Sequence, residues 1–147
     1  MVFLAMLVVL FDQYSKYYIQ SNMVVGHSIP VIQDVFHLTY ILNPGAAFGV
    51  LEYKTTFFVS VALLMIGGIV LFYQRITKMH KLLRLGVGLL SGGALGNVID
   101  RVRLGCVVDF FDFRIWPVFN VADIAIVMGV ACIIYVLLFV AEDTLSK

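Results

Sequence analysis

The chain has 147 residues, of which 62% are hydrophobic and 13% are charged, and its formal net charge is +1 at pH 7. A soluble domain of this length cannot bury so much apolar surface, and a nearly neutral chain lacks the basic excess of nucleic-acid-binding proteins. We therefore predict a single membrane-embedded domain that comprises residues 1–147.

Four apolar segments predict an all-α integral membrane protein, a bundle of four transmembrane helices. The predicted helices cover about residues 1–20, 55–74, 83–101 and 118–141. The first is free of charge only over Met1–Phe11, which as a helix spans roughly 16 Å, about half of a hydrocarbon core. A first helix that crosses the membrane must therefore carry Asp12 and Lys16 in or near the bilayer. We expect these two residues to pair, with the Lys16 side chain extended toward water in a structural role.

The link between the second and third helices, residues 75–82, predicts the orientation. With the first residues of the third helix it contributes four basic residues and no acid: Arg75, Lys78, Lys81 and Arg84. Loops with an excess of Lys and Arg stay in the cytoplasm, so both termini are expected there, with outer loops at residues 21–54 and 102–117. Most of the acidic residues then lie on the outer side or at its membrane edge, where we expect any chemistry to occur.

The first outer loop is too long for a simple connection and predicts a small extracytoplasmic structure. Val35–Leu42 is rich in β-branched and aromatic residues, and Asn43-Pro44-Gly45 is typical of a turn. We predict a short β-hairpin over residues 35–51 that rests on the membrane surface.

The third helix carries two sets of residues on adjoining faces. Glycines recur every four residues at Gly88, Gly92 and Gly96, a pattern that lets another helix approach closely. The neighbouring face carries Gly93, Asn97, Asp100 and Arg101. These residues predict either a packing groove closed by an Asp100–Arg101 ion pair, or part of a functional site, because polar residues inside membranes tend to be functional.

An Asn-x-x-Asp unit occurs twice, as Asn97–Asp100 and as Asn120–Asp123. Asn120 follows Pro117 at the start of the fourth helix, so it is a candidate N-cap, with Asp123 complementing the helix dipole. Capping does not by itself require an acid beside hydrocarbon, where ionisation is costly. A capping role and a catalytic role for Asp123 are therefore both open.

Asp109 and Asp123 are the candidate catalytic pair. They lie 123 − 109 = 14 residues apart, with Trp116-Pro117 between them to turn the chain. If the second outer loop folds back, the two carboxyl groups meet at the mouth of the bundle and share one proton, because neighbouring carboxylates in a partly dry site do not both ionise easily. By analogy with aspartic proteases, the ionised member activates water and the protonated member polarises a carbonyl group.

Other catalytic residues fit the pattern less well. Asp112 is a rival member of the pair if residues 109–112 are helical, and is otherwise a solvated loop acid. Ser15 and Lys16 are adjacent, so on a helix their side chains diverge rather than form a dyad. The three histidines are scattered, no metal-binding motif is present, and we predict neither a metal nor another cofactor.

Two further classes of function remain open at this point. Buried acids also build ion or proton pathways in channels and transporters, but such pathways need polar residues at several depths, whereas the predicted polar groups here gather at one end. A structural or assembly role is supported only by the glycine pattern.

Five motifs, in this order, give the chain a resemblance to a known family. They are Asp12-Gln13-Tyr14-Ser15-Lys16, Asn43-Pro44-Gly45-Ala46-Ala47-Phe48, Gly93-Ala94-Leu95-Gly96-Asn97-Val98-Ile99-Asp100-Arg101, Val107-Val108-Asp109-Phe110 and Phe119-Asn120-Val121-Ala122-Asp123. Over nearly its whole length the chain resembles lipoprotein signal peptidase, also called signal peptidase II.

The resemblance implies a bacterial inner-membrane aspartic endopeptidase with four transmembrane helices, both termini in the cytoplasm and an active site near the outer leaflet. Such an enzyme removes signal peptides from prolipoproteins by cutting before a diacylglyceryl-modified cysteine, uses a small outer sheet to cradle substrate, and is inhibited by globomycin. Asp109 and Asp123 match its catalytic pair. The positions that match its substrate- or inhibitor-binding and site-shaping residues are Asp12, Asn43, Gly93, Asn97, Asp100, Arg101, Asn120 and Ala122. The stretch between Asp109 and Asp123 is short for the family, and we predict that the protein acts as a monomer on membrane lipid and lipoprotein substrates.

Overall fold

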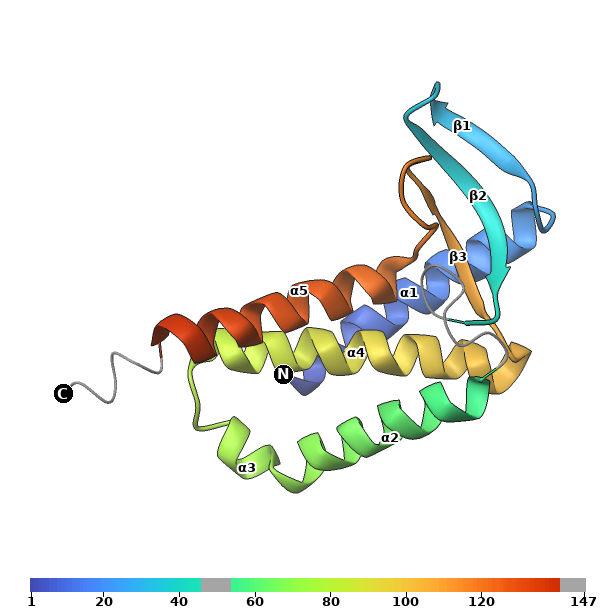
Figure 1. Ribbon diagram of the computed structural model, residues 1–147. Coiled ribbons are helices and arrows are strands. Elements are labelled where there is room, and N and C mark those ends of the chain that lie inside the picture. The colour runs from blue at the N-terminus through green and yellow to red at the C-terminus, as the bar shows by residue number, and fades with distance from the viewer. Residues whose placement is uncertain (46–53, 141–147) are drawn as a thin grey trace.

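The computed structural model describes residues 1–45 and 54–140, which form helices with a small sheet at one end (Figure 1). The helices are α1 (Val2–Asn22), α2 (Thr55–Leu71), α3 (Tyr73–Ile76), α4 (Lys81–Leu104) and α5 (Val121–Tyr135), which continues as the π-helix η2 (Val136–Val140). The strands are β1 (Ser28–Ile32), β2 (Phe36–Asn43) and β3 (Val107–Asp112).

Three helices within the described residues are long and apolar enough to cross a membrane: α1, α4, and α5 together with η2. The predicted membrane class and sheet are therefore confirmed. The second predicted helix, residues 55–74, is apolar but shorter, because α2 has 17 residues and ends at Leu71 before the separate short helix α3. Seventeen helical residues cover roughly 26 Å, slightly less than a typical hydrocarbon core, so the fourth span stays a prediction.

Helix α4 is the centre of the bundle and packs between α1 and α5. The glycines of α4 make this possible. A Cβ atom at Gly92 would lie 2.8 Å from the carbonyl oxygen of Ala5 on α1, and one at Gly93 would meet the carbonyl oxygen of Ala122 on α5. The predicted close approach of another helix is confirmed, and it occurs on two faces of α4 rather than one.

The three strands form an antiparallel sheet in the order β1-β2-β3. The hairpin between β1 and β2 turns around Asp34, whose φ of 60° is in the left-handed region. The predicted hairpin over residues 35–51 is therefore misplaced, because its turn precedes β2 and its first strand begins at Ser28. Residues 46–51 lie outside the described part of the chain. The partner of β2 on its other side is β3 from the second outer loop, which places Ile41 opposite Asp109.

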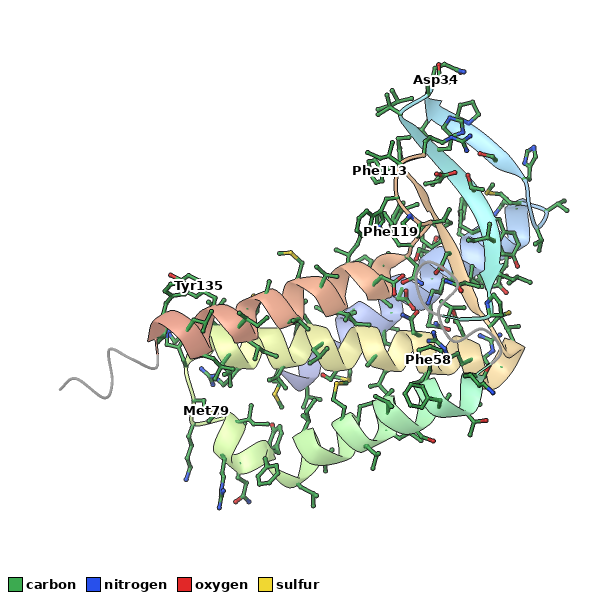
Figure 2. The ribbon with its side chains drawn as sticks, viewed as in Figure 1. Asp34, Phe58, Met79, Phe113, Phe119 and Tyr135 are labelled. Carbon is green, nitrogen blue, oxygen red and sulfur yellow. The ribbon has the colours of Figure 1, made fainter. Side chains whose placement is uncertain are left out.

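The sheet rises from one end of the bundle, and aromatic rings fill the angle between it and the start of α5 (Figure 2). Phe113 and Phe119 stack with their ring centres 5.9 Å apart, and Phe36 packs on Phe113 at 4.9 Å. These contacts fix how β3 leads into α5, and therefore how the two candidate aspartates approach each other.

The described chain ends, at Val140, at the end of the bundle opposite the sheet (Figure 1), and Met1 lies against Gly88 in the half of α4 away from the sheet. Helices α1 and α4 run toward the sheet, whereas α2 and α5 run away from it. The basic residues predicted to be cytoplasmic, from Arg75 to Arg84, therefore lie at the far end from Asp109 and Asp123. This relative arrangement agrees with the predicted topology.

Candidate active site

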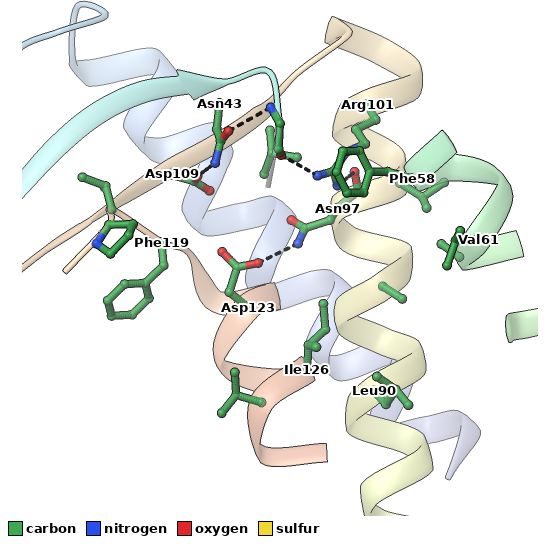
Figure 3. Close-up of a pocket in the computed structure, with 18 of the residues that line it drawn as sticks. Asn43, Phe58, Val61, Leu90, Asn97, Arg101, Asp109, Phe119, Asp123 and Ile126 are labelled. Carbon is green, nitrogen blue, oxygen red and sulfur yellow. Dashed lines mark hydrogen bonds between the residues drawn. The ribbon is translucent and has the colours of Figure 1, made fainter. Parts of the chain in front are cut away.

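Asp109 and Asp123 lie on the wall of one cavity at the sheet end of the bundle (Figure 3). Strand β3 supplies Asp109, and the first turn of α5 supplies Asp123. The cavity has a volume of about 480 Å³ and is bounded by α2, α4, α5 and the loop before α5. Both carboxyl groups project toward this space from different elements, as predicted for the candidate pair.

Asp109 is almost completely enclosed, with 2% of its surface exposed. Its two carboxyl oxygens accept hydrogen bonds from the side-chain amides of Asn43, at 2.8 Å, and Asn120, at 2.6 Å. Burial and the neighbouring charge of Asp123 together raise the pKa of Asp109 to about 7, although these hydrogen bonds act in the opposite direction. Asp109 is therefore able to carry a proton near neutral pH.

Asp123 is the third residue of α5 and forms a capping box with Asn120. The Asn120 side chain accepts the Asp123 backbone N–H at 2.9 Å, and the Asp123 carboxylate accepts the Asn120 backbone N–H at 3.2 Å. The other Asp123 oxygen accepts a hydrogen bond from the Asn97 amide at 2.8 Å. The predicted N-cap is confirmed, and it leaves Asp123 half-buried on the cavity wall.

Two asparagines connect the candidate pair. The Asn120 amide that donates to Asp109 also donates to the Asn97 side-chain oxygen, at 3.2 Å, and Asn97 in turn donates to Asp123. These three hydrogen bonds connect the two carboxyl groups through the side-chain amides of Asn120 and Asn97. Asn97 and Asn120 therefore each hold an oxygen of one candidate aspartate.

Arg101 lies on the same cavity wall but does not form the predicted ion pair with Asp100. Its guanidinium stacks over the Phe58 ring, 4.7 Å from the ring centre, and donates to the backbone oxygens of Asn97 and Gly45. Adjacent helical residues point in different directions, so Asp100 faces α1 and pairs with Lys16 at 2.8 Å. Arg101 therefore fixes the chain after Asn43, and the Asp100–Arg101 prediction is wrong.

Asp12 and Lys16 pair as predicted, with 2.9 Å between the charged atoms. Lys16 does not extend toward water, however, because only 1% of its surface is exposed and its ammonium lies between Asp12 and Asp100. Gln13 donates to both carboxylates, a role that was not predicted. Its place directly after Asp12 in the first motif was the signal that could have indicated it.

Gly93 and Ala122 shape the site through packing rather than through polar groups. Ala122 is fully buried, and its carbonyl oxygen lies against Gly93 where α4 and α5 cross. This close crossing allows the polar side chains of Asn97 and Asp123 to reach each other. Both residues lie in the contact between α4 and α5, next to Ala94 and Asp123 on the cavity wall.

Asp112 is separated from the candidate pair by the strand geometry of β3. Residues three apart in a strand point to opposite faces, so the helical interpretation that made Asp112 a rival is wrong. Asp112 instead accepts hydrogen bonds from Thr39, at 2.7 Å, and from Arg114. Ser15 is likewise turned away from Lys16 and donates to the Asp12 backbone oxygen.

The rest of the cavity wall is largely apolar. Helix α2 contributes Phe58, Val61, Ala62 and Met65, and helices α4 and α5 add Leu90 and Ile126. The polar groups gather at the end nearest the sheet, and the apolar walls extend along the bundle from there. Such a site is suited to an extended or helical apolar chain with one polar, reactive segment. The contribution of α2 was not predicted, because this helix carries no charged side chain.

Comparison with known proteins identifies a family. The family model described as signal peptidase (SPase) II matches residues 4–139. A lipoprotein signal peptidase of Moorella thermoacetica is 53% identical over 95% of this chain and 93% of its own length, and one of Clostridioides difficile is 51% identical over 90% of each. A solved structure described as a bacterial membrane enzyme superposes with a TM-score of 0.89, at 39% identity, over 99% of this chain and 90% of that one. With both its sequence and its fold matched along almost the entire length, the chain belongs to the signal peptidase II family.

Proposed function

We propose that this protein is an aspartic endopeptidase that removes signal peptides from bacterial prolipoproteins, cutting just before a diacylglyceryl-modified cysteine. Family membership supports the protease activity and the class of substrate. The observation that carries the catalytic assignment is the meeting of Asp109 and Asp123 in one cavity, joined through Asn97 and Asn120. No metal or other cofactor enters this reaction.

In the proposed reaction Asp109 begins protonated and Asp123 begins ionised. Asp123 takes a proton from water, whose oxygen attacks the carbonyl carbon of the scissile bond while Asp109 gives its proton to the carbonyl oxygen. In the resulting tetrahedral diol, Asp123 returns its proton to the leaving nitrogen as the C–N bond breaks. One diol hydroxyl gives its proton back to Asp109, which leaves a carboxylic acid, an amine and the starting protonation state.

The remaining matched residues orient the reacting groups or bind substrate in this proposal. Asn43 and Asn120 hold the Asp109 carboxyl group, and Asn97 holds that of Asp123. Arg101 uses two of its five guanidinium N–H groups in hydrogen bonds to the backbone. The others can donate to the carbonyl groups of an extended peptide. The apolar wall from α2 and α5 receives the signal peptide, and the diacylglyceryl chains lie in the lipid.

We also propose that the chain is a single, monomeric, four-span domain of the bacterial inner membrane, with both termini cytoplasmic and the active site near the outer leaflet. The separation of the basic α3–α4 link from the sheet end supports this orientation. Lipid-exposed side chains such as Leu64 and Leu71, 77% and 83% exposed, support α2 as the fourth span. A modest tilt of its neighbours or local thinning of the bilayer accommodates its short length.

Cleavage of a lipidated precursor peptide by the purified protein tests the proposal. We expect cleavage before the modified cysteine, inhibition by globomycin, and no cleavage of the same peptide without its diacylglyceryl group. Replacing either Asp109 or Asp123 by Asn should reduce kcat by about 10⁴-fold or more, since each removes one partner of the proton transfers.

The matched control is Asp112→Asn, which changes a carboxylate on the same strand that points away from the cavity. This variant should cleave at a rate close to that of the unmodified protein. Retained cleavage in both Asp109→Asn and Asp123→Asn, with a normal unfolding temperature, would exclude the aspartic mechanism.

A further inference from the structure

A buried ionic cluster lies beside the proposed catalytic pair, and none of its members contacts the cavity. Its centre is Lys16 on α1, whose ammonium is 2.9 Å from Asp12 and 2.8 Å from Asp100. All three residues are at most 2% exposed. Removing an ammonium and two carboxylates from water costs several kcal/mol per ion, so the cluster needs good geometry and further hydrogen bonds to persist.

Those further hydrogen bonds come from two backbone N–H groups, each of which lies one residue before a proposed catalytic aspartate. Asp12 accepts the N–H of Ala122 at 2.9 Å, and Asp100 accepts the N–H of Val108 at 3.1 Å. Ala122 immediately precedes Asp123, and Val108 immediately precedes Asp109. Each carboxylate partner of Lys16 is therefore bonded to the residue next to one of the two proposed catalytic aspartates.

Water cannot compete for these two backbone hydrogen bonds. Ala122 and Val108 both have 0% of their surface exposed. Hydrogen bonds to an ionised acceptor are about twice as strong as those between neutral groups. A single ammonium on α1 thus fixes the start of α5 and the start of β3 relative to each other, although these elements come from different parts of the chain.

Lys16 also makes a third contact, with the side-chain oxygen of Asn97 at 3.0 Å. That oxygen accepts from Asn120 as well, so two donors point at it. Rotating the Asn97 amide by half a turn would direct its NH₂ group at the Lys16 ammonium, which is unfavourable. The contact therefore keeps the Asn97 NH₂ directed at Asp123, the orientation found in the structure.

We propose that Lys16 is a positioning residue for the peptidase reaction. Through Asp12 and Asp100 it sets the spacing of the two aspartates, and through Asn97 it orients the Asp123 carboxylate. This inference rests on the proposed function and adds a role to a lysine that never touches substrate.

The first test compares Lys16→Met with Lys81→Met, which makes the same substitution at an exposed lysine at the far end of α4. In Lys16→Met we expect kcat for the lipidated peptide to fall roughly 100-fold with KM little changed, since displacing reacting groups by about 1 Å costs this much. Lys81→Met should match the unmodified protein. Thermal unfolding in detergent shows whether each variant is folded.

A second variant separates positioning from stability, because two buried carboxylates left without Lys16 are expected to weaken the fold. Lys16→Met combined with Asp12→Asn and Asp100→Asn leaves the cluster neutral, and its amide oxygens still accept the two backbone N–H groups through weaker bonds. We expect this triple variant to be folded and its kcat to remain about 10- to 100-fold low.

The pH dependence of kcat/KM provides a readout that stability alone does not move. Charged or titratable groups that act on Asp109 come from several elements: Asp123 on α5, Lys16 on α1, Arg101 on α4, and Cys106 before β3, with Asp12 and Asp100 paired to Lys16. Loss of the Lys16 charge raises the pKa of Asp109, whereas movement of Asp123 away from Asp109 lowers it. A shift of the alkaline limb of the triple variant to lower pH therefore reports a displaced pair and not the missing charge.

The outcomes distinguish the inference from the function on which it rests. A folded triple variant with the kcat and pH profile of the unmodified protein would overturn the positioning role alone. Absence of cleavage by the unmodified protein would overturn the proposed function and this inference together. A folded triple variant with a low kcat, an unchanged KM and an alkaline limb shifted to lower pH would support the positioning role of Lys16.

Discussion

At the scale of single residues, the site depends on two carboxyl groups held in different surroundings. Asp109 is enclosed and receives only side-chain amides, whereas Asp123 is half-buried on the cavity wall and completes a helix cap. Burial and the charge of Asp123 raise the pKa of Asp109 to about 7, which supports Asp109 as the proton carrier in the proposed reaction. In that proposal the surroundings distinguish the two roles, since both residues are aspartates.

The pH dependence of cleavage follows from this assignment. An acid whose pKa is raised to about 7 keeps its proton below that pH and loses it above, so we expect kcat/KM to fall as the pH rises through about 7. Well above that pH, kcat/KM should fall about tenfold per pH unit. Initial rates for the lipidated peptide at concentrations well below KM, between pH 5 and pH 9, measure this. A rate that is constant to pH 9 would contradict Asp109 as the proton donor.

At the scale of the elements, α4 determines how the site is assembled. Its glycines bring α1 against one face and α5 against another, and its polar residues near the sheet end face the partners supplied by both helices. Strand β3 then follows α4 after a left-handed Gly105, whose φ of 76° ends the helix and returns the chain over the bundle. Helix packing and the polar network are therefore two consequences of the same arrangement.

Replacing Gly93 by Ala tests this dependence. The added Cβ would meet the backbone oxygen of Ala122, so we expect overpacking to lower the stability by about 1–3 kcal/mol and to displace Asp123, with a loss of kcat. The control is Gly67→Ala in α2, where a Cβ meets nothing within 4 Å. That substitution should leave kcat unchanged and add up to about 1 kcal/mol of stability.

Thermal unfolding in detergent and initial cleavage rates measure both glycine variants. Equal behaviour of Gly93→Ala and Gly67→Ala would mean that α5 can move away from α4 without cost. The close crossing would then not be what places Asp123.

At the scale of the whole molecule, the sheet and the proposed catalytic pair lie at one end of the bundle, and the basic link lies at the other. Apolar side chains cover the helices between these ends, including Leu64 on α2 and Val127 on α5. In the proposed function, a lipid-bearing substrate approaches sideways through the bilayer and water reaches the aspartates from the sheet end.

Cysteine labelling of cells tests the proposed orientation. In a background with Cys106 and Cys132 replaced by Ser, Gln33→Cys in the sheet turn should react with a membrane-impermeant maleimide added outside. Lys78→Cys in the basic link should react only after the cells are permeabilised. Both positions are exposed, so a difference in reactivity reports the side of the membrane. The reverse pattern would place the active site in the cytoplasm.

The sequence alone determined the membrane class, the approximate helices and the two aspartates as candidates, because apolar composition, charge distribution and short motifs are local properties. It did not determine that residues 107–112 form a strand, since β3 exists only through pairing with β2 from another loop. For the same reason it misplaced the hairpin and made Asp112 a rival. It paired Asp100 with its neighbour Arg101 because the partner that Asp100 finds, Lys16, lies on another helix. Only the tertiary structure decided that α1 supplies a buried lysine to Asp100 and Asn97, because such contacts join residues more than 80 positions apart. Burial makes them specific: an ion enclosed in the bundle must find a partner wherever the fold provides one.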